Sequence, residues 1–529
     1  MFKQSITHIS SEQSQQDSSK LYISERESNS LSLRKKKIND LLMKKRHINL
    51  PRKETPSEFV INIDDLNLSP DVTTQSFQSP THFLTQMLNY LNTNSLPYIQ
   101  FAIQKIRTYT IEKDCDYNLI PNSGVIEALL SLIQQHIEHT KIAYEIIWIF
   151  INVTTRLDNN ELIYKLTDDK LLNVYYTLMQ KQHEEWFHIT IWLLRNVTCN
   201  NKESLTKVVK SKIFNEHIVK YLKRETKEYN IEVLIDVISI CANIPLLFNY
   251  NIINDIDNNN TNEYIELEEL LTRELCEKCL INNKEIAKTC LYGLVELSNS
   301  KNLTVCNLIF SSGIIRHLVK NKIAGAFEMG HQCLILIGNF LANQSQDIID
   351  PIFYRELVIY LGGFVINSPN SEIKKTAYWA LSNILVDNKE KNDFVFNSEL
   401  MGVMLRDAQL AEPKVQYEVL YALNCMLGER DPETVIKLET YHLMDIMLKI
   451  LRDETVSTFG MTLVWNIIDT ILSVGEMVRD YDKDKQNVFL RKFQQSGGVD
   501  LMNKYFNHQD VELSQYVQKI AEKLFQINA

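Results

Sequence analysis

The stretch EIIWIFINVTT, residues 145–155, recurs with variations along the chain, and this recurrence decides the fold. The other copies are ITIWLLRNVTC (189–199), DVISICANIPL (236–246), TCLYGLVELSN (289–299), CLILIGNFLAN (333–343), TAYWALSNILV (376–386) and EVLYALNCMLG (418–428). The position of Asn152 is held in turn by Asn196, Asn243, Glu296, Asn339, Asn383 and Cys425, at steps of 44, 47, 53, 43, 44 and 42 residues. Self-similarity at a nearly fixed period predicts a chain of stacked structural repeats.

The composition and the flanking sequences indicate that these repeats are helical. Gly (14 residues) and Pro (11) are scarce among 529 residues, and alternation of β-branched side chains is hard to find. The longest step contains the tract NDIDNNNTN (254–262), which we expect to be a surface loop. Three segments place Gly before a new apolar run, as the hinge of a helical repeat requires: SGVIEALLSLI (123–133), SGIIRHLVKNK (312–322) and SGGVDLMNKYF (496–506). A period in the low forties with three helical segments per unit predicts an all-α, right-handed armadillo-repeat solenoid of about ten repeats over residues 80–529.

The N-terminal region has a different composition. Residues 1–53 begin as a polar, Ser- and Gln-rich stretch and continue into LRKKKINDLLMKKRHINLP (33–51). Between residues 34 and 53 there are nine Lys or Arg and one acid, on a chain whose net charge is -10. The Leu and Ile residues of this segment recur at spacings compatible with one helical face. We therefore expect a disordered N-terminus with a basic arm, about residues 20–53, that folds on a partner, followed by a linker over 54–79.

The sequence offers no support for an enzyme, a metal centre or a membrane span. No apolar leader and no uninterrupted apolar run of membrane-spanning length is present. The nine cysteines are scattered, as in reducing compartments, and Cys276-x-x-Cys279 lacks a second pair at ligand spacing. The segment DYDKDKQNVFLR (480–491) begins like a calcium loop, but Lys485 and Arg491 replace its Gly and Glu. We expect no catalytic residues and no cofactor.

Trp and Asn recur together, four residues apart, within the repeated helix. The pairs are Trp148 with Asn152, Trp192 with Asn196, and Trp379 with Asn383. Four residues turn a helix by about 400°, so both side chains emerge on one face. A single Trp on a helix is more often a core residue, but three at one phase favour a lined inner groove. The Asn amide would hold a peptide backbone, and slots between neighbouring Trp rings would accept the stems and cationic heads of Lys and Arg.

This Trp-x-x-x-Asn pattern on consecutive repeats resembles the importin alpha family of nuclear import adaptors. The basic arm resembles the importin-beta-binding segment of that family, and KFQQSGGVDLMNKYFNHQDVELSQYVQKIAEKLF (492–525) resembles its closing repeat. The likeness runs from about residue 20 to the C-terminus. It implies an adaptor that shuttles between cytoplasm and nucleus, binds Lys/Arg-rich nuclear localisation signals, couples them to importin beta and is recycled by a nuclear export receptor. From the charge of the body and the lack of a long apolar run, we expect no nucleic-acid partner and no membrane insertion.

The resemblance also implies two binding sites and names their residues. The major site would comprise Trp148, Asn152, Trp192, Asn196 and Asn243, and the minor site Trp379, Asn383, Glu418 and Tyr421. The chain departs from the family pattern at five positions. Ser239 replaces a Trp, Tyr421 and Cys425 replace a Trp and an Asn, Asn200 replaces the acid that reads a cargo lysine, and Arg156 occupies a normally uncharged position. These departures weaken selection for a basic peptide.

Two roles are expected for the basic arm. Arg34, Lys35, Lys36 and Lys37 would contact importin beta. Lys44, Lys45 and Arg46 resemble an internal mimic of a localisation signal and would compete with cargo for the groove through an intramolecular contact.

Other readings of the same residues stay open. The arm could be a solvated tail or a generic anion patch, although the net charge of about -18 on the rest of the chain argues against an extended nucleic-acid surface. The body could be a divergent armadillo scaffold that binds other extended peptides outside import. A helical regulatory subunit of an enzyme is a third class, without positive sequence support.

Overall fold

In the computed structural model every described element is helical, and the chain divides into two compact units, Met1–Leu247 (unit 1) and Phe248–Ala529 (unit 2). The basic arm lies outside the described residues, and so does Asn200. The unit boundary falls within the longest step of the repeat, next to a gap in the description. The structure describes residues 57–525 apart from short gaps at 75, 113, 158, 182, 200, 225–228, 249–260, 301, 321–326, 344–349, 386–388, 397, 429–430, 453–455 and 482–486.

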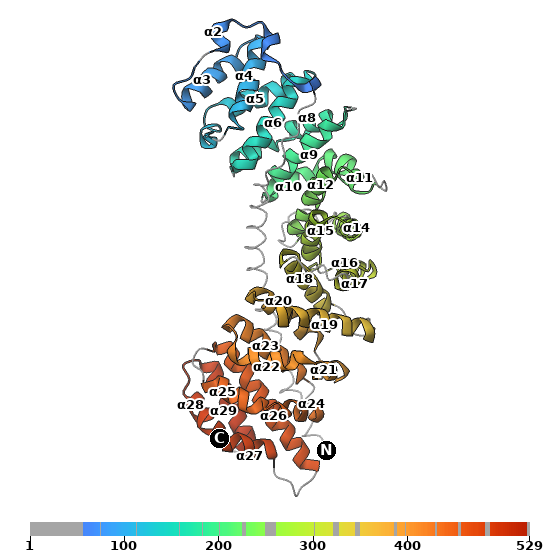
Figure 1. The fold of residues 1–529 in the computed structure, drawn as a ribbon, viewed down its shortest axis with the longest axis vertical. Helices are drawn as coiled ribbons and strands as arrows, with labels where there is room; N and C mark the ends of the chain where they lie inside the picture. The colour runs from blue at the N-terminus through green and yellow to red at the C-terminus, as the bar shows by residue number, and fades with distance from the viewer. Residues whose placement is uncertain are drawn as a thin grey trace. The chain divides into compact units, whose positions relative to one another are not determined.

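Unit 1 begins with one-turn helices and continues as a series of longer ones (Figure 1). Its described elements are η1 (Ser57–Phe59), η2 (Ile63–Leu66), α2 (Pro70–Thr73), α3 (Pro80–Leu91), α4 (Leu96–Tyr109), η3 (Tyr117–Leu119), α5 (Val125–Gln135), α6 (Thr140–Arg156), α7 (Asn160–Leu166), α8 (Asp169–Met179), α9 (Glu184–Thr198), α10 (Lys202–Lys210), η4 (Phe214–Val219), α11 (Lys220–Leu222), α12 (Ile231–Asn243) and α13 (Pro245–Phe248).

Unit 2 is likewise a series of helices (Figure 1). Its described elements are α14 (Thr261–Cys279), α15 (Lys284–Leu297), α16 (Leu303–Ser311), α17 (Ile314–Lys320), α18 (Phe327–Asn343), α19 (Pro351–Asn367), α20 (Ser371–Ile384), α21 (Lys389–Phe396), α22 (Glu399–Leu410), α23 (Pro413–Met426), α24 (Pro432–Thr440), α25 (Leu443–Arg452), α26 (Thr458–Tyr481), α27 (Val488–Gln495), α28 (Gly498–Phe506) and α29 (Val511–Phe525).

The recurring stretches of the sequence form corresponding helices. They lie in α6, α9 and α12 of unit 1 and in α15, α18, α20 and α23 of unit 2. Within unit 1, α4 contacts α6, α6 contacts α9, and α9 contacts α12. Within unit 2, α15 contacts α18, α18 contacts α20, and α20 contacts α23. The prediction of an all-α fold is confirmed for the described residues, and within each unit the repeated helices pack on one another in chain order.

Local sequence signals begin many of these helices. Asn residues accept hydrogen bonds from backbone N–H groups in the first turn, which satisfies donors that have no partner inside the helix. The capping residues of this kind are Asn159, Asn201, Asn230, Asn283, Asn302, Asn370 and Asn487. The predicted glycine hinges are confirmed: Gly124, Gly313 and Gly497 have φ of 80°, 75° and 76° directly before α5, α17 and α28. A side chain at these positions would be strained.

Part of the range expected to be a linker packs into the folded protein. Phe59 and Ile61, in the range expected to be a linker, are buried, at 3% and 4% exposure.

Helix α26 contains a window, Thr458–Val478, that is apolar enough by length and composition to cross a membrane. It is the one such helix among the residues that the structure describes, and 67% of the window is buried inside the protein. That burial is typical of a core helix.

Candidate functional site

Trp148 and Trp192, from the neighbouring helices α6 and α9, contact each other directly. Their ring centroids lie 5.2 Å apart at an interplanar angle of 76°, which is an edge-to-face arrangement. Both side chains are half-buried. The structure therefore brings the two predicted residues together. It differs from the expected slot, because the edge of one ring occupies the space between them.

The chain's own cation lies against Trp148. The Arg107 guanidinium, from α4, is 5.3 Å from the centroid of the Trp148 ring, and its Nη1 lies 2.5 Å from Oε1 of Glu145. Burial raises the pKa of the Glu145 carboxyl, and the hydrogen bond and charge of Arg107 oppose that rise. A cation on an indole face is the contact expected for a bound Lys or Arg. An incoming basic side chain must therefore use the remaining ring surface or displace Arg107.

Two of the predicted asparagines of unit 1 form hydrogen bonds to the preceding repeat. Asn152 donates from Nδ2 to Oγ1 of Thr110 at 3.0 Å. Asn196 donates from Nδ2 to Oγ1 of Thr154 at 3.3 Å and of Thr155 at 3.0 Å. Sequence reasoning assigned these amides to a peptide and missed their threonine partners. The signal was present in NVTT (152–155), where hydroxyl residues follow the Asn by two and three positions.

The third predicted helix of the major site carries no aromatic ring at the matching position. Ser239 of α12 is buried and donates its hydroxyl to the carbonyl oxygen of Ile235, within its own helix, at 2.6 Å. Asn243 is buried one turn later. Arg156 is exposed at the last residue of α6. In unit 1 the pair of indoles is thus not extended onto α12.

Two of the three repeated helices of unit 1 carry an acidic residue at the same phase, and α9 has Ile189 there. Glu145 precedes Asn152 by seven residues, and Asp236 precedes Asn243 by seven. Asp236 pairs with Arg195 of α9, with Oδ1 and Nη1 2.5 Å apart, in parallel with the Arg107–Glu145 pair. These ion pairs join α4 to α6 and α9 to α12. They were not predicted, because the arginines lie about forty residues from their partners in the sequence.

In unit 2, Trp379 and Asn383 of α20 meet the same residue of α18. A Cβ atom built on Gly338 would lie 2.0 Å from Cζ3 of the Trp379 ring. Asn383 donates from Nδ2 to the carbonyl oxygen of Gly338 at 3.0 Å. Only a glycine at position 338 leaves room for the Trp379 ring. The sequence pattern did not identify Gly338 as part of the site.

The other residues of the predicted minor site lie on α23. Glu418 is buried, and Tyr421 is half-buried with its ring centroid 6.4 Å from that of Tyr417. Cys425 is half-buried one turn after Tyr421. Because α20 contacts α23, the structure places Glu418 and Tyr421 on the helix next to Trp379.

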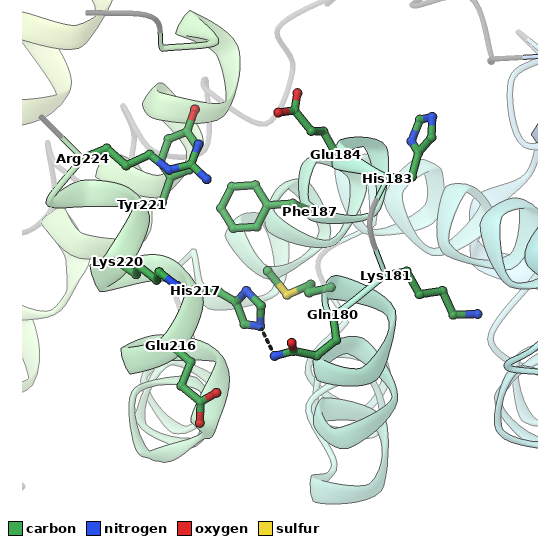
Figure 2. Close-up of a pocket in the computed structure, with 11 residues that line it drawn as sticks. Gln180, Lys181, His183, Glu184, Phe187, Glu216, His217, Lys220, Tyr221 and Arg224 are labelled. Carbon is green, nitrogen blue, oxygen red and sulfur yellow. Dashed lines mark hydrogen bonds between the residues drawn. The ribbon is translucent and has the colours of Figure 1, made fainter. Parts of the chain in front are cut away.

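Unit 1 also has a cavity of about 420 Å³ that sequence reasoning did not anticipate. It is lined by α8, α9 and η4 with α11, and η4 is a π-helix. Phe187 stacks on Tyr221 with centroids 4.9 Å apart, and Arg224 lies 4.7 Å from the centroid of Tyr221. Figure 2 shows these rings and His217, whose Nε2 is 3.1 Å from Nε2 of Gln180. Burial lowers the pKa of His217.

The described residues contain no group of three or more His, Cys, Asp or Glu side chains placed to hold a metal ion. All nine cysteines are free thiols, and burial raises the pKa of Cys276 to about 11. A thiol with a pKa this high is a poor nucleophile at neutral pH.

No family model matches the chain, and no curated protein matches it. Among solved structures, an engineered protein from the Northeast Structural Genomics Consortium is similar over 84% of this chain and 99% of its own, with a TM-score of 0.63 and 16% sequence identity. A second engineered protein covers 48% of this chain and 96% of its own at 17% identity, with a TM-score of 0.40. The first likeness shows a shared fold and nothing about function.

Proposed function

We propose that this chain is an armadillo-repeat nuclear import adaptor of the importin alpha type. Its repeats, about ten in a right-handed solenoid, would bind Lys/Arg-rich localisation signals, and its basic arm would link the cargo to importin beta. The period in the low forties supports the repeat assignment, together with the packing of α4, α6, α9 and α12 in chain order. A shuttling adaptor of this kind would also need an export receptor.

The observation that carries the proposal is the Arg107 guanidinium over Trp148, beside Trp192. It is a contact of the kind that a cargo Lys or Arg would make, formed here by the chain itself. A basic peptide would lay its aliphatic stems along the indoles and place its charges near Glu145. Since the Asn196 amide group donates to threonines, its carbonyl oxygen is the atom that would accept a peptide N–H. The minor site would use Trp379, Asn383, Glu418 and Tyr421 in the same way.

The receptor half of the proposal is tested by a pull-down with importin beta. The full chain should be captured, and a chain lacking residues 1–53 should not. Charge reversal at Arg34, Lys35, Lys36 and Lys37 should weaken capture and reduce its salt sensitivity, because those charges would form the contact. Equal capture of the full and shortened chains would remove the strongest support for an adaptor.

The cargo half is tested with a fluorescent basic peptide and a copy in which every Lys and Arg is replaced by Gln. An adaptor should bind the basic peptide at least tenfold more tightly, with an affinity that falls as salt rises. Indifference to the replacement would overturn localisation-signal binding.

A second candidate function is supported by specific observations. The edge-to-face contact of Trp148 with Trp192 closes one slot, and Ser239 and Cys425 lack the side chains that would extend the groove. These features favour a divergent scaffold that holds other extended peptides. Such a scaffold would bind the Gln-substituted peptide as well as the basic one, so the peptide pair decides between the two functions.

A further inference from the structure

Arg156 continues the row that Trp148 and Asn152 form on helix α6. The three residues are four positions apart, so each follows the last by about one helical turn, or about 6 Å along the axis. Trp148 and Asn152 are half-buried, and Arg156, the last residue of the helix, is exposed. A peptide held at Asn152 would therefore lie within reach of the Arg156 guanidinium.

The helix segments that would face the peptide carry arginines and no acid. Residues 148–156 of α6 and 192–198 of α9 contain Arg156 and Arg195, and neither segment contains an Asp or a Glu. The guanidinium of Arg195 is already paired with the carboxylate of Asp236. The charge of Arg156 is therefore the one that these segments leave uncompensated.

Acids elsewhere in this part of unit 1 do not pair with Arg156. Burial raises the pKa of the Cys115 thiol to about 11, Asp116 and Glu112 add to that rise, and Arg156 opposes it. Both carboxylates thus lie near the thiol that senses Arg156, but no described residue forms an ion pair with its guanidinium. Glu145, the one acid of α6, is 2% exposed and lies about three turns away. An anionic side chain of a peptide would displace no described partner of Arg156.

Asn152 fixes where such a peptide would run. Its Nδ2 donates to Oγ1 of Thr110 at 3.0 Å, which leaves its carbonyl oxygen to accept a peptide N–H. Successive side chains of an extended peptide point to opposite sides, so neighbouring residues cannot both turn toward α6. Arg156 would therefore read one residue of the peptide.

We propose that Arg156 makes the site on α6 and α9 selective for a mixed-charge peptide, with one Asp or Glu at a fixed position among its basic residues. The acidic residue would pair with Arg156 while the basic residues lie along Trp148 and Trp192. This inference rests on the peptide-binding part of the proposed function and narrows its substrate class. A cation at the same peptide position would be repelled, so Arg156 acts by attraction and by exclusion.

The expected size of the effect follows from the exposure of Arg156. A contact between exposed charges changes affinity by up to about fivefold, and salt screens it. The acidic residue should therefore give a gain of about threefold to fivefold at low salt, and the gain should shrink as salt rises.

The test uses the full chain and a series of fluorescein-labelled copies of one basic peptide, in which Glu or Gln replaces each residue in turn. At one position the wild type should bind the Glu copy about threefold to fivefold more tightly than the Gln copy. Arg156→Gln should abolish this preference, and Arg156→Glu should reverse it. Lys210→Glu is the matched control, because Lys210 is also the exposed last residue of a helix, α10, which lies outside the repeated helices. It removes the same charge and the same favourable cation at a helix C-terminus, and it should keep the wild-type preference.

The outcomes separate this inference from the proposed function. If the basic peptide binds but Glu is never preferred over Gln, the inference alone is overturned. A preference that Arg156→Glu keeps, or that Lys210→Glu also loses, would overturn it too, because another residue or the overall charge would then be the cause. If no peptide of the series binds the wild type or Arg156→Gln, the proposed function fails and the inference fails with it. If a copy without any Lys or Arg binds as well as the basic peptide, while one Glu position is preferred and Arg156→Glu reverses that preference, localisation-signal binding fails and the inference stands.

Discussion

The indole of Trp379 lies against the backbone of Gly338, so closely that a Cβ atom at residue 338 would stand 2.0 Å from Cζ3 of the ring. Asn383, one turn along α20, donates to the carbonyl oxygen of the same glycine. Two side chains that were expected to face a ligand thus depend on one backbone position of the preceding repeated helix. Because Gly338 has no side chain, the Trp379 ring can pack directly on the helix backbone.

Gly338→Ala should therefore displace Trp379 and destabilise unit 2. Crowding of this kind costs about 1–3 kcal/mol, more than the gain in helix propensity of about 1 kcal/mol. Gly402→Ala in α22 is the control, because nothing lies within 4 Å of a Cβ built there. Urea denaturation should show a lower midpoint for the first variant and an equal or higher midpoint for the second. Equal effects would contradict the packing described.

The binding energy of a basic peptide should come mainly from the repeats that keep both the Trp and the Asn of the Trp-x-x-x-Asn pattern. Trp148→Ala, Trp192→Ala and Trp379→Ala should each cost about 1–3 kcal/mol of affinity, as measured by fluorescence anisotropy. Tyr421→Ala should cost less.

The control for this ranking is Tyr164→Ala, because Tyr164 carries a Lys207 cation 5.8 Å from its ring but lies on α7, outside the repeated helices. Losses at Tyr421 or Ser239 as large as those at the three tryptophans would show that the peptide follows another path.

Arg107→Gln should strengthen the binding of basic peptides while lowering stability. The substitution exposes the Trp148 face that Arg107 covers, so an incoming cation can take its place there. Breaking a buried pair by removing one partner typically costs about 3–5 kcal/mol. Arg195→Gln, which breaks the equivalent pair with Asp236, is the matched control. Both variants should lose thermal stability, and only the first should gain peptide affinity. A gain in both would show that the more negative net charge of the chain is the cause.

Glu268 should make the stability of unit 2 depend on pH. Burial raises the pKa of this carboxyl, although Ser300 donates its hydroxyl to both carboxylate oxygens at 3.0 and 3.1 Å. A raised folded-state pKa favours the protonated form, so the contribution of this group to stability is complete below the ordinary pKa of 4.5 and is lost as pH rises through the folded value.

The comparison for Glu268 is Glu268→Gln. The melting temperature of this variant relative to the wild type should rise by a few degrees between about pH 4.5 and pH 7.5. A difference that stays constant over this window would show that Glu268 does not carry the effect.

Local sequence signals predicted the repeated helices and, at three glycines, the positions at which a helix begins. The apolar period and the recurrence of one stretch located α6, α9 and α20 with their Trp and Asn residues in phase. Glycines before apolar runs predicted the left-handed backbone at Gly124 and Gly497. These features are encoded within a few residues of where they act, because hydrogen bonds of a helix and its caps join near neighbours in the chain.

The partners of each side chain were decided by tertiary packing. Arg107 reaches Trp148 and Glu145 from the preceding repeat, Thr154 and Thr155 take the hydrogen bonds of Asn196, and Gly338 makes room for Trp379. Phe59 packs against Tyr144 and Trp186, which lie 85 or more positions away in the sequence. Residues on adjacent stacked helices are about forty positions apart, and no local pattern fixes which of them touch. The sequence by itself therefore determined the helices and the phase of their aromatic and amide residues. Only the tertiary structure decided which atoms of these Trp and Asn side chains are already in contact with other residues of the chain. Those contacts depend on how one helix packs against the next.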